Sequence, residues 1–274
     1  MEPIRLTPVF MQKIWGGNRL RDKFNYDIPF DHCGECRVSD ADSPILVKLI
    51  DAREDLSVQV HPDDAYAHAH ENGASGKAEC WYILDAKPGS SIVLGHNAKN
   101  REQLQDMIFE GRWDSLLRVV PVHPGDLFMI PPGTLHAIRA GVMLLEVQQN
   151  SDLTYRFYDY DRLENGKPRE LHIEKALDVV TAPFRPADAN PVLRPTSNPA
   201  FVQLCTCEHF TVWKLEVRDS SLLVQDRDFM IVSAVDGAGQ INESPARAGD
   251  HFLLPRDFGS ARVTGDLTLI IASP

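Results

Sequence analysis

The sequence has no apolar run long enough to cross a membrane. A transmembrane helix needs about 20 consecutive apolar residues, and the 274 residues contain no such stretch. Residues 1–8 also lack the basic start and apolar core of a secretory signal peptide. We therefore expect a soluble, cytoplasmic protein without a membrane partner.

Clusters of positive charge are absent as well. The chain has 28 Lys and Arg against 39 Asp and Glu, which gives a formal net charge of −11. Nucleic acids and anionic membranes attract proteins through basic patches, so neither is expected as a partner. A small molecule is favoured instead, and the sequence carries no signal for an oligomeric state.

Cysteines are few and irregularly spaced. There are five, an odd number that fits a reducing compartment better than a disulfide framework. Cys33 and Cys36 form a CxxC pair, which could belong to a zinc ribbon or a redox site. However, Cys205 and Cys207 have the wrong spacing for a second half-site, and no βαβ pattern surrounds Cys33. We expect free thiols.

Helical patterns are scarce, and most apolar segments indicate strands. Helical periodicity is clearest at 101–110, 113–117 and 172–180. Short β-branched or alternating runs recur between Gly, Pro and Asn residues, at 45–50, 56–61, 80–84, 91–94, 127–130 and 143–148. This pattern predicts a fold dominated by β-structure, with a few inserted helices.

One segment of the sequence occurs twice. Pro-Gly-Asp-Leu-Phe-Met-Ile-Pro at 124–131 is matched by Ala-Gly-Asp-His-Phe-Leu-Leu-Pro at 248–255, and two copies of one β unit are the simplest explanation. Between them, residues 182–199 contain five prolines and no apolar periodicity, which indicates an extended linker. We therefore predict a first barrel over 1–181, this linker, and a second barrel over 200–274.

Four residues with metal-binding side chains lie on separate apolar segments. Gln59 and His61 alternate with valines and so point to the same face of a strand. Glu79 begins a second segment, and His136 follows a Pro-Gly turn. Nitrogen and oxygen ligands of this mixture suit Zn²⁺ or another divalent first-row ion. Gln59 could instead lie beside the ligands, because neutral amides are uncommon zinc ligands.

The motif Gly-Asp-x-x-x-x-Pro-x-Gly-x-x-His, from Gly125 to His136, resembles the second motif of the cupins. These are small jelly-roll barrels that hold a metal in the mouth, so the resemblance implies two cupin-like jelly-roll barrels here. In the second copy Ser260 stands at the position of His136, and no Gln-x-His precedes it. Only the first barrel is therefore expected to hold a metal.

Further motifs between about residues 3 and 180 resemble type I mannose-6-phosphate isomerases, also called phosphomannose isomerases, in their short bacterial form. They occur in the family's order: Pro-Val-Phe at 8–10, Ile-Trp-Gly-Gly at 14–17, Gln-Val-His-Pro-Asp-Asp at 59–64, Gly-Lys-Ala-Glu-Cys-Trp-Tyr at 76–82, Pro-Pro-Gly-Thr-Leu-His-Ala at 131–137 and Ser-Asp-Leu-Thr-Tyr-Arg at 151–156. One departure is visible, because the Gly-Glu-x-Trp pattern of many relatives here ends in Arg37.

The resemblance implies an enzyme with one Zn²⁺ per chain. It would interconvert mannose 6-phosphate and fructose 6-phosphate through a metal-stabilised cis-enediol or enediolate, with proton and hydride transfer both left open. The resemblance puts Arg156 at the position of the family's active-site arginine, and Lys77 and Asp152 at positions implicated in proton transfer. The family's metal ligands fall on Gln59, His61, Glu79 and His136.

The chemistry of these side chains fits an isomerisation. Lys77 lies two residues before Glu79 and shares its strand face if the strand extends that far back. A neighbouring dication would lower the pKa of Lys77 to a value useful for proton transfer. Arg156 could stabilise the charge of an enediolate, with Asp152 as a carboxylate partner.

The substrate would need further contacts. Trp15 precedes two glycines and could either pack beside a tight turn or line the sugar pocket together with Lys77. Basic residues that could bind the phosphate lie in or after the last motif, namely Arg156, Arg162, Lys167 and Arg169.

Two other functions fit part of the pattern. A cupin oxygenase typically uses Fe²⁺ and a more His-rich ligand set, and it would leave Lys77, Asp152 and Arg156 unexplained. A non-catalytic metal-binding or sugar-binding cupin would bind without turnover. The isomerase is the hypothesis that uses all of these residues.

Overall fold

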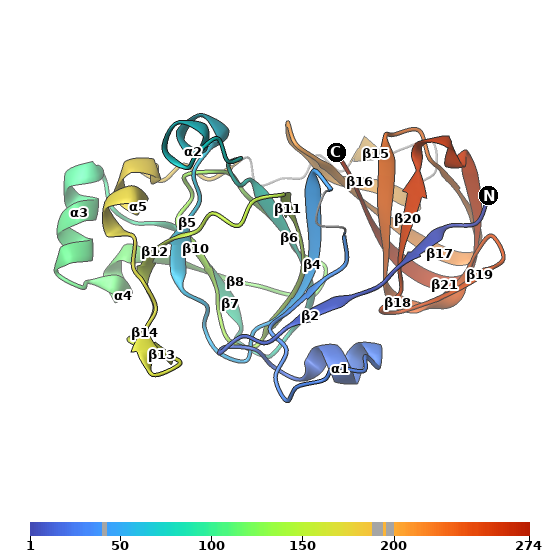
Figure 1. Cartoon of the computed structure of the whole chain (residues 1–274), viewed down its shortest axis with the longest axis horizontal. Helices are drawn as coiled ribbons and strands as arrows, with labels where there is room; N and C mark the ends of the chain where they lie inside the picture. The colour runs from blue at the N-terminus through green and yellow to red at the C-terminus, as the bar shows by residue number, and fades with distance from the viewer. Residues whose placement is uncertain (40–42, 188–193, 196–199) are drawn as a thin grey trace.

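The computed structural model describes residues 1–39, 43–187, 194–195 and 200–274. In this part of the chain strands dominate, as predicted, and the five α-helices are short. The predicted helices near 101–110, 113–117 and 172–180 are confirmed. The helices are α1 (Arg19–Phe24), α2 (Asp64–His70), α3 (Arg101–Phe109), α4 (Trp113–Leu116) and α5 (Ile173–Val179), and one 3-10 turn spans Arg256–Phe258. Figure 1 shows α3, α4 and α5 together at one end of the molecule.

Two antiparallel sheets make up most of the first half, and each predicted strand there is confirmed. The six-stranded sheet contains, in spatial order, β2 (Val9–Met11), β3 (Glu35–Arg37), β4 (Ile45–Asp51), β11 (Val142–Gln149), β6 (Glu79–Ala86) and β9 (Leu127–Ile130). The five-stranded sheet contains β12 (Tyr155–Tyr158), β5 (Val58–Val60), β10 (His136–Ile138), β7 (Ser91–His96) and β8 (Leu117–Pro121). A small hairpin joins β13 (Leu163–Glu164) to β14 (Lys167–Pro168).

A third, eight-stranded sheet forms the second half. Its order is β1 (Ile4–Leu6), β20 (His251–Pro255), β18 (Phe229–Ile241), β21 (Ser260–Ser273), β17 (Thr211–Val224), β16 (Phe201–Thr206) and β15 (Arg194–Pro195), with β19 (Ser244–Arg247) paired to β18. The chain's first strand therefore belongs to the last sheet. Figure 1 shows the dark-blue amino-terminal segment crossing from that sheet to β2.

The six-stranded sheet is covered on both faces. One face packs against the five-stranded sheet through a core that includes Trp81, Ile92 and Leu144. The other face packs against the eight-stranded sheet through a core that includes Val47 and Ile270. Every residue of β4 is consequently buried, which explains why its sequence is a nearly continuous apolar run.

The repeated sequence folds into the same turn in both places. Gly125 and Gly249 adopt left-handed backbone angles of φ 94° and 93°, which favour glycine. In each copy the following aspartate accepts a hydrogen bond from a backbone N–H three residues earlier, at 2.7 Å for Asp126 and 2.9 Å for Asp250. The shared sequence thus reflects shared local geometry.

Other predictions concern segments that the structure describes only in part. Much of the predicted linker at 182–199 lies outside the described residues, so its boundaries stay a prediction.

All five cysteines are free thiols, as expected. None of the helices in the described part of the chain has the length and apolarity of a membrane-spanning segment.

A buried histidine connects the two halves. The His251 ring lies 2.9 Å from the Tyr26 hydroxyl and 2.9 Å from the Ser233 hydroxyl. Because Tyr26 donates its proton to the carbonyl of Gly249 at 2.7 Å, its oxygen accepts from the imidazole Nε2–H. Burial, and secondarily the charge of Arg5, lowers the pKa of His251 to about 3.

This low pKa predicts acid sensitivity. Below pH 6.5 the unfolded chain protonates His251 while the folded chain does not, so stability falls as the pH falls from 6.5 towards 3. By pH 5 this one group should remove about 2 kcal/mol of unfolding free energy. Denaturant titrations at pH 7 and pH 5 should therefore show the advantage of wild type over His251→Gln shrinking by that amount. An equal advantage at both pH values would contradict the assignment.

Candidate active site

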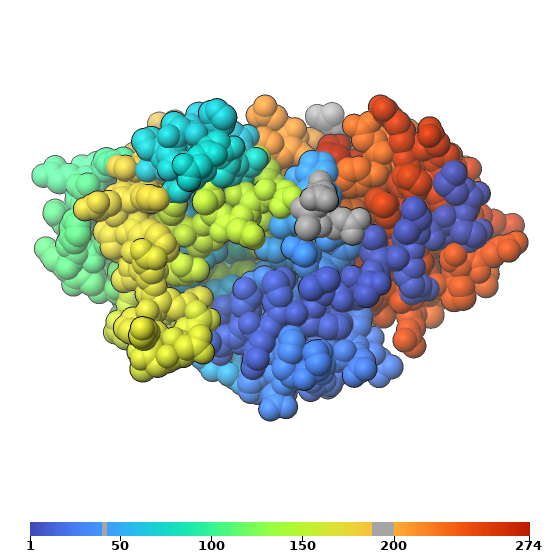
Figure 2. All heavy atoms as spheres, viewed as in Figure 1, coloured from blue at the N-terminus to red at the C-terminus, as the bar shows by residue number. Residues whose placement is uncertain are grey.

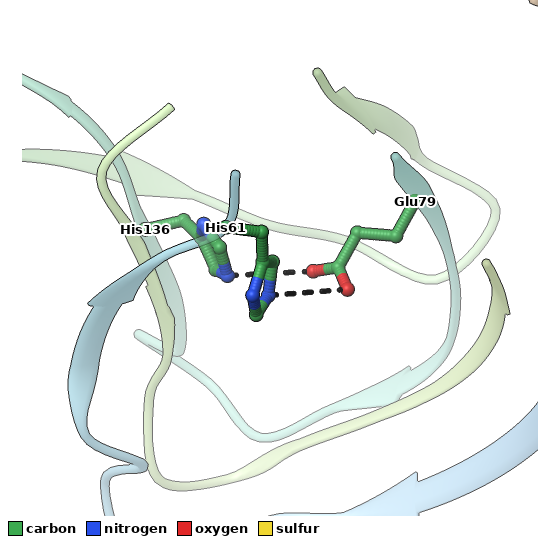
Figure 3. Close-up of side chains that lie close together, drawn as sticks. All are labelled: His61, Glu79 and His136. Atoms are coloured by element: carbon green, nitrogen blue, oxygen red, sulfur yellow. Dashed lines mark ion pairs between the residues drawn. The ribbon is translucent and has the colours of Figure 1, made fainter. Parts of the chain in front are cut away.

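Three buried side chains from both sheets converge on one point. His61 follows β5, His136 begins β10, and Glu79 begins β6 on the facing sheet. The Nε2 atoms of His61 and His136 lie 3.5 Å and 3.4 Å from the two carboxylate oxygens of Glu79, as Figure 3 shows. Among the described residues, this is the one group of His, Cys, Asp and Glu side chains close enough together to hold a metal ion. We refer to His61, Glu79 and His136 as the metal group.

Backbone carbonyls orient both imidazoles. The Nδ1 atom of His61 lies 2.7 Å from the carbonyl of Leu153, and that of His136 lies 2.8 Å from the carbonyl of Thr134. Each Nδ1 must carry the proton, so each Nε2 lone pair points inward. Burial lowers the pKa of His61 well below its usual value and that of His136 to about 4. Both rings are therefore neutral at pH 7, as metal ligation requires.

Several of these converging atoms lack a hydrogen-bond partner. The Nε2 atom of His61 and the Oε1 atom of Glu79 are buried without one in the described part of the structure, and Oε2 of Glu79 is contacted by the ammonium group of Lys77. Buried polar atoms are nearly always satisfied in proteins. Their convergence marks the place where a cation would complete the site.

Gln59 lies at the edge of this group. It is the register partner of His136 on one side and of Arg156 on the other. Its amide nitrogen is 3.3 Å from Nε2 of His136, and its amide oxygen accepts from the Ser57 hydroxyl at 3.1 Å. Metal binding through this oxygen would require the amide to rotate by half a turn, so its role as a ligand stays a prediction.

Lys77 lies directly beside the group. Its Nζ is 3.0 Å from Glu79, on the side that strand alternation predicts. Burial lowers the pKa of Lys77, but the carboxylates of Glu79 and Glu146 outweigh that effect, and the pKa is raised. The lowering expected from a dication concerns the metal-loaded protein and stays a prediction.

A row of polar side chains crosses the six-stranded sheet and was not foreseen. Arg37, Lys48, Glu146 and Trp81 are successive cross-strand partners and so share one face. Glu146 accepts from Nε1 of Trp81 at 3.0 Å and lies 3.6 Å from Nζ of Lys48. The available signal was a charged residue in the middle of each of two mostly apolar strands, since charged residues are rarely buried without a partner.

A cavity of about 370 Å³ lies between the two sheets beside the metal group. Figure 2 shows a hollow in this face, between the blue amino-terminal segment and the yellow segment that includes β13 and β14. A volume of this order suits one small ligand. The predicted site residues that line the cavity are Trp15, Gln59, Lys77, Asp152 and Arg156.

Arg156 and Asp152 both line this cavity but differ in how far they are buried. Nε of Arg156 is buried without a hydrogen-bond partner among the described residues, whereas Asp152 is exposed. Burial, with a contribution from the nearby charge of Arg169, lowers the pKa of Arg156. A guanidinium in this state is well suited to receive an anionic ligand.

The other candidates for phosphate binding differ in whether they line the cavity. Arg162 is not part of the cavity lining and instead contacts the carboxylate of Asp159 and the carbonyl of Asp55. Arg169 does line the cavity, but it also binds Asp159, with Nε 2.7 Å from Oδ2. Lys167 is exposed on β14, outside the lining.

Comparisons with known proteins all point to one family. Residues 200–274 match the family model described as mannose-6-phosphate isomerase, cupin domain. The chain is 39% identical over 311 residues to the mannose-6-phosphate isomerase ManA of Bacillus subtilis, covering 99% of this chain and 98% of the relative. It is 40% identical over 309 residues to the mannose-6-phosphate isomerase of Streptococcus mutans, covering 98% and 97%.

The structural comparison agrees with the sequence comparison. The fold matches the crystal structure of the mannose 6-phosphate isomerase from Bacillus subtilis with a TM-score of 0.93 and 38% identity, covering 100% of both chains. This chain is therefore an enzyme of the mannose-6-phosphate isomerase family.

Proposed function

We propose that the chain interconverts mannose 6-phosphate and fructose 6-phosphate with one Zn²⁺ held by His61, Glu79 and His136, and with Gln59 as a fourth ligand. The observation that carries the proposal is the convergence of buried, unsatisfied ligand atoms beside a cavity lined by Arg156. The names of the relatives supply the substrate.

The donor set fits zinc. Two neutral imidazoles and a carboxylate are the three protein ligands of many catalytic zinc sites, which keep a further position for substrate or water. When bound there, the ion would act as a Lewis acid towards the substrate's oxygens. The ligand set at this site is neither purely histidine nor thiolate-based.

The surrounding residues would divide the remaining work. Isomerisation moves hydrogen between C2 and C1 while negative charge develops on the neighbouring oxygen. The fixed positive charge of Arg156 would stabilise that oxygen. We assign proton movement to Lys77, whose Nζ lies next to the metal group, together with Asp152. Trp15 would form one wall of the sugar pocket.

The proposal extends to the architecture and location. Residues 1–181 and 200–274 would form two cupin-like jelly-roll barrels joined by 182–199, with the metal in the first and with β1 contributed to the sheet of the second. The repeated turn and the cupin family match at 200–274 support this division. A cytoplasmic location agrees with five free thiols.

A chelation assay tests the activity. The zinc-loaded protein should convert mannose 6-phosphate to fructose 6-phosphate, lose the activity in a chelator, and regain it when Zn²⁺ is restored. Oxygen consumption, recorded in parallel, separates an oxygenase from an isomerase. Metal binding without any turnover would favour a non-catalytic cupin, and conversion by protein shown to be metal-free would contradict the proposed mechanism.

A further inference from the structure

We propose that Arg37 is the phosphate anchor of the cavity, at the end remote from the metal group. This inference rests on the proposed function, since it assigns the 6-phosphate of the substrate to a particular side chain. Arg37 lies on β3 and lines the cavity. It is not one of the three residues of the metal group, and it stands where the Gly-Glu-x-Trp pattern of many relatives has tryptophan.

Charge pairing within the cavity singles out two guanidinium groups. Six cationic side chains line it, and four of them are paired with carboxylates: Lys13 with Glu35 at 3.3 Å, Lys48 with Glu146 at 3.6 Å, Lys77 with Glu79 at 3.0 Å, and Arg169 with Asp159 at 2.5 Å. For Arg37 and Arg156 the described residues provide no ion pair, and the Nε of each is buried without a hydrogen-bond partner. These two side chains are therefore available to a ligand.

The two free guanidinium groups come from facing sheets. Arg156 is the register partner of Gln59, which is in turn the partner of His136, so it lies next to the metal group. Arg37 is on β3, which is three strands away from β6 and Glu79 in the other sheet. Strands lie about 4.8 Å apart, which separates the backbone of Arg37 by about 14 Å from that of Trp81, its counterpart in register on β6. Glu79 lies two residues further along β6, so its backbone is more distant still.

This separation matches the chemistry of the substrate. In an open-chain hexose 6-phosphate the reacting carbons C1 and C2 are at one end, and the phosphate is at the other. With C1 and C2 beside the metal group, Arg156 is positioned for the developing enediolate rather than for the phosphate. Arg37 then offers the guanidinium fork that binds phosphate through two parallel hydrogen bonds.

The surroundings of Arg37 support a binding role over a structural one. Its cross-strand partner is Lys48, another cation. Lys48 is itself paired with Glu146, which leaves Arg37 without a carboxylate partner among the described residues, and a partly buried unpaired charge destabilises the folded chain unless an anion binds to it. Removing Arg37 should therefore leave the protein at least as stable as before while weakening its hold on a phosphate.

Binding of sorbitol 6-phosphate tests the assignment, because this ligand keeps the phosphate but has no carbonyl to isomerise. Calorimetric titration should show ten- to hundredfold weaker binding to Arg37→Met, as expected for the loss of charge-assisted hydrogen bonds, and a smaller loss for Arg37→Lys. Arg218→Met is the matched control, since Arg218 is 72% exposed on β17, in the other half of the molecule. The melting temperature of Arg37→Met should equal or exceed that of wild type.

The outcomes separate this inference from the proposed function. An unchanged affinity of Arg37→Met for sorbitol 6-phosphate would overturn the assignment. So would a result in which Arg156→Met loses binding of this ligand while Arg37→Met keeps it. Failure of the wild-type protein to bind sorbitol 6-phosphate would overturn it as well. If wild type binds this ligand through Arg37 but does not convert mannose 6-phosphate, the anchor stands and the isomerase proposal is wrong.

Discussion

His136→Ala should lose both the bound metal and the activity. The substitution removes one of the inward-facing Nε2 atoms and leaves the carboxylate of Glu79 without one of its two imidazole neighbours. A catalytic metal contributes several kcal/mol to transition-state stabilisation, so turnover should fall by roughly a thousandfold or more. Elemental analysis of the dialysed protein and the isomerase assay measure the two effects together.

His123→Ala is the appropriate control. The side chain of His123 is 79% exposed, outside the metal group, so the same change of residue type should leave metal content and turnover at wild-type values. Full metal occupancy in His136→Ala would show that His136 is not a ligand.

Arg156→Ala should lower kcat by about a hundred- to a thousandfold, the range seen when one transition-state hydrogen-bond donor is removed. The reason is that its guanidinium has no ion pair among the described residues and is free for the charge that develops on the substrate. Steady-state kinetics should show the loss mainly in kcat, because the interaction forms in the transition state.

Metal content distinguishes this role from an indirect one. Arg156 is the register partner of Gln59 rather than a member of the metal group, so Arg156→Ala should retain its metal, and Arg156→Lys should recover part of the rate through the restored charge. Loss of metal in Arg156→Ala would mean that the arginine supports the ligands. A wild-type kcat would exclude it from the chemistry.

Local sequence signals predicted where His61, Glu79 and His136 would lie. Strand alternation placed His61 on the inner face, and a Pro-Gly turn delivered His136 onto a new strand. Lys77 lies beside Glu79 as the two-residue period requires. These inferences needed only the geometry of a few consecutive residues.

Contacts that depend on long-range strand pairing were not predictable in the same way. Lys48 and Glu146 lie 98 positions apart in the sequence and meet because β4 pairs with β11 in one particular register. For Arg162, closeness in the sequence was a poor guide to position. It follows the last motif closely, which suggested substrate binding, but in the folded chain it forms an ion pair with Asp159 and does not line the cavity. Register and competing partners are properties of the folded chain rather than of any short segment.

The pairing of β1 with β20 has a consequence for how the chain is made. Ile4 is synthesised long before its partner Leu253. The eight-stranded sheet therefore cannot be completed until β20 has been synthesised. Until then the outer apolar face of the six-stranded sheet lacks its cover, so the nascent chain would expose it to chaperones and to self-association.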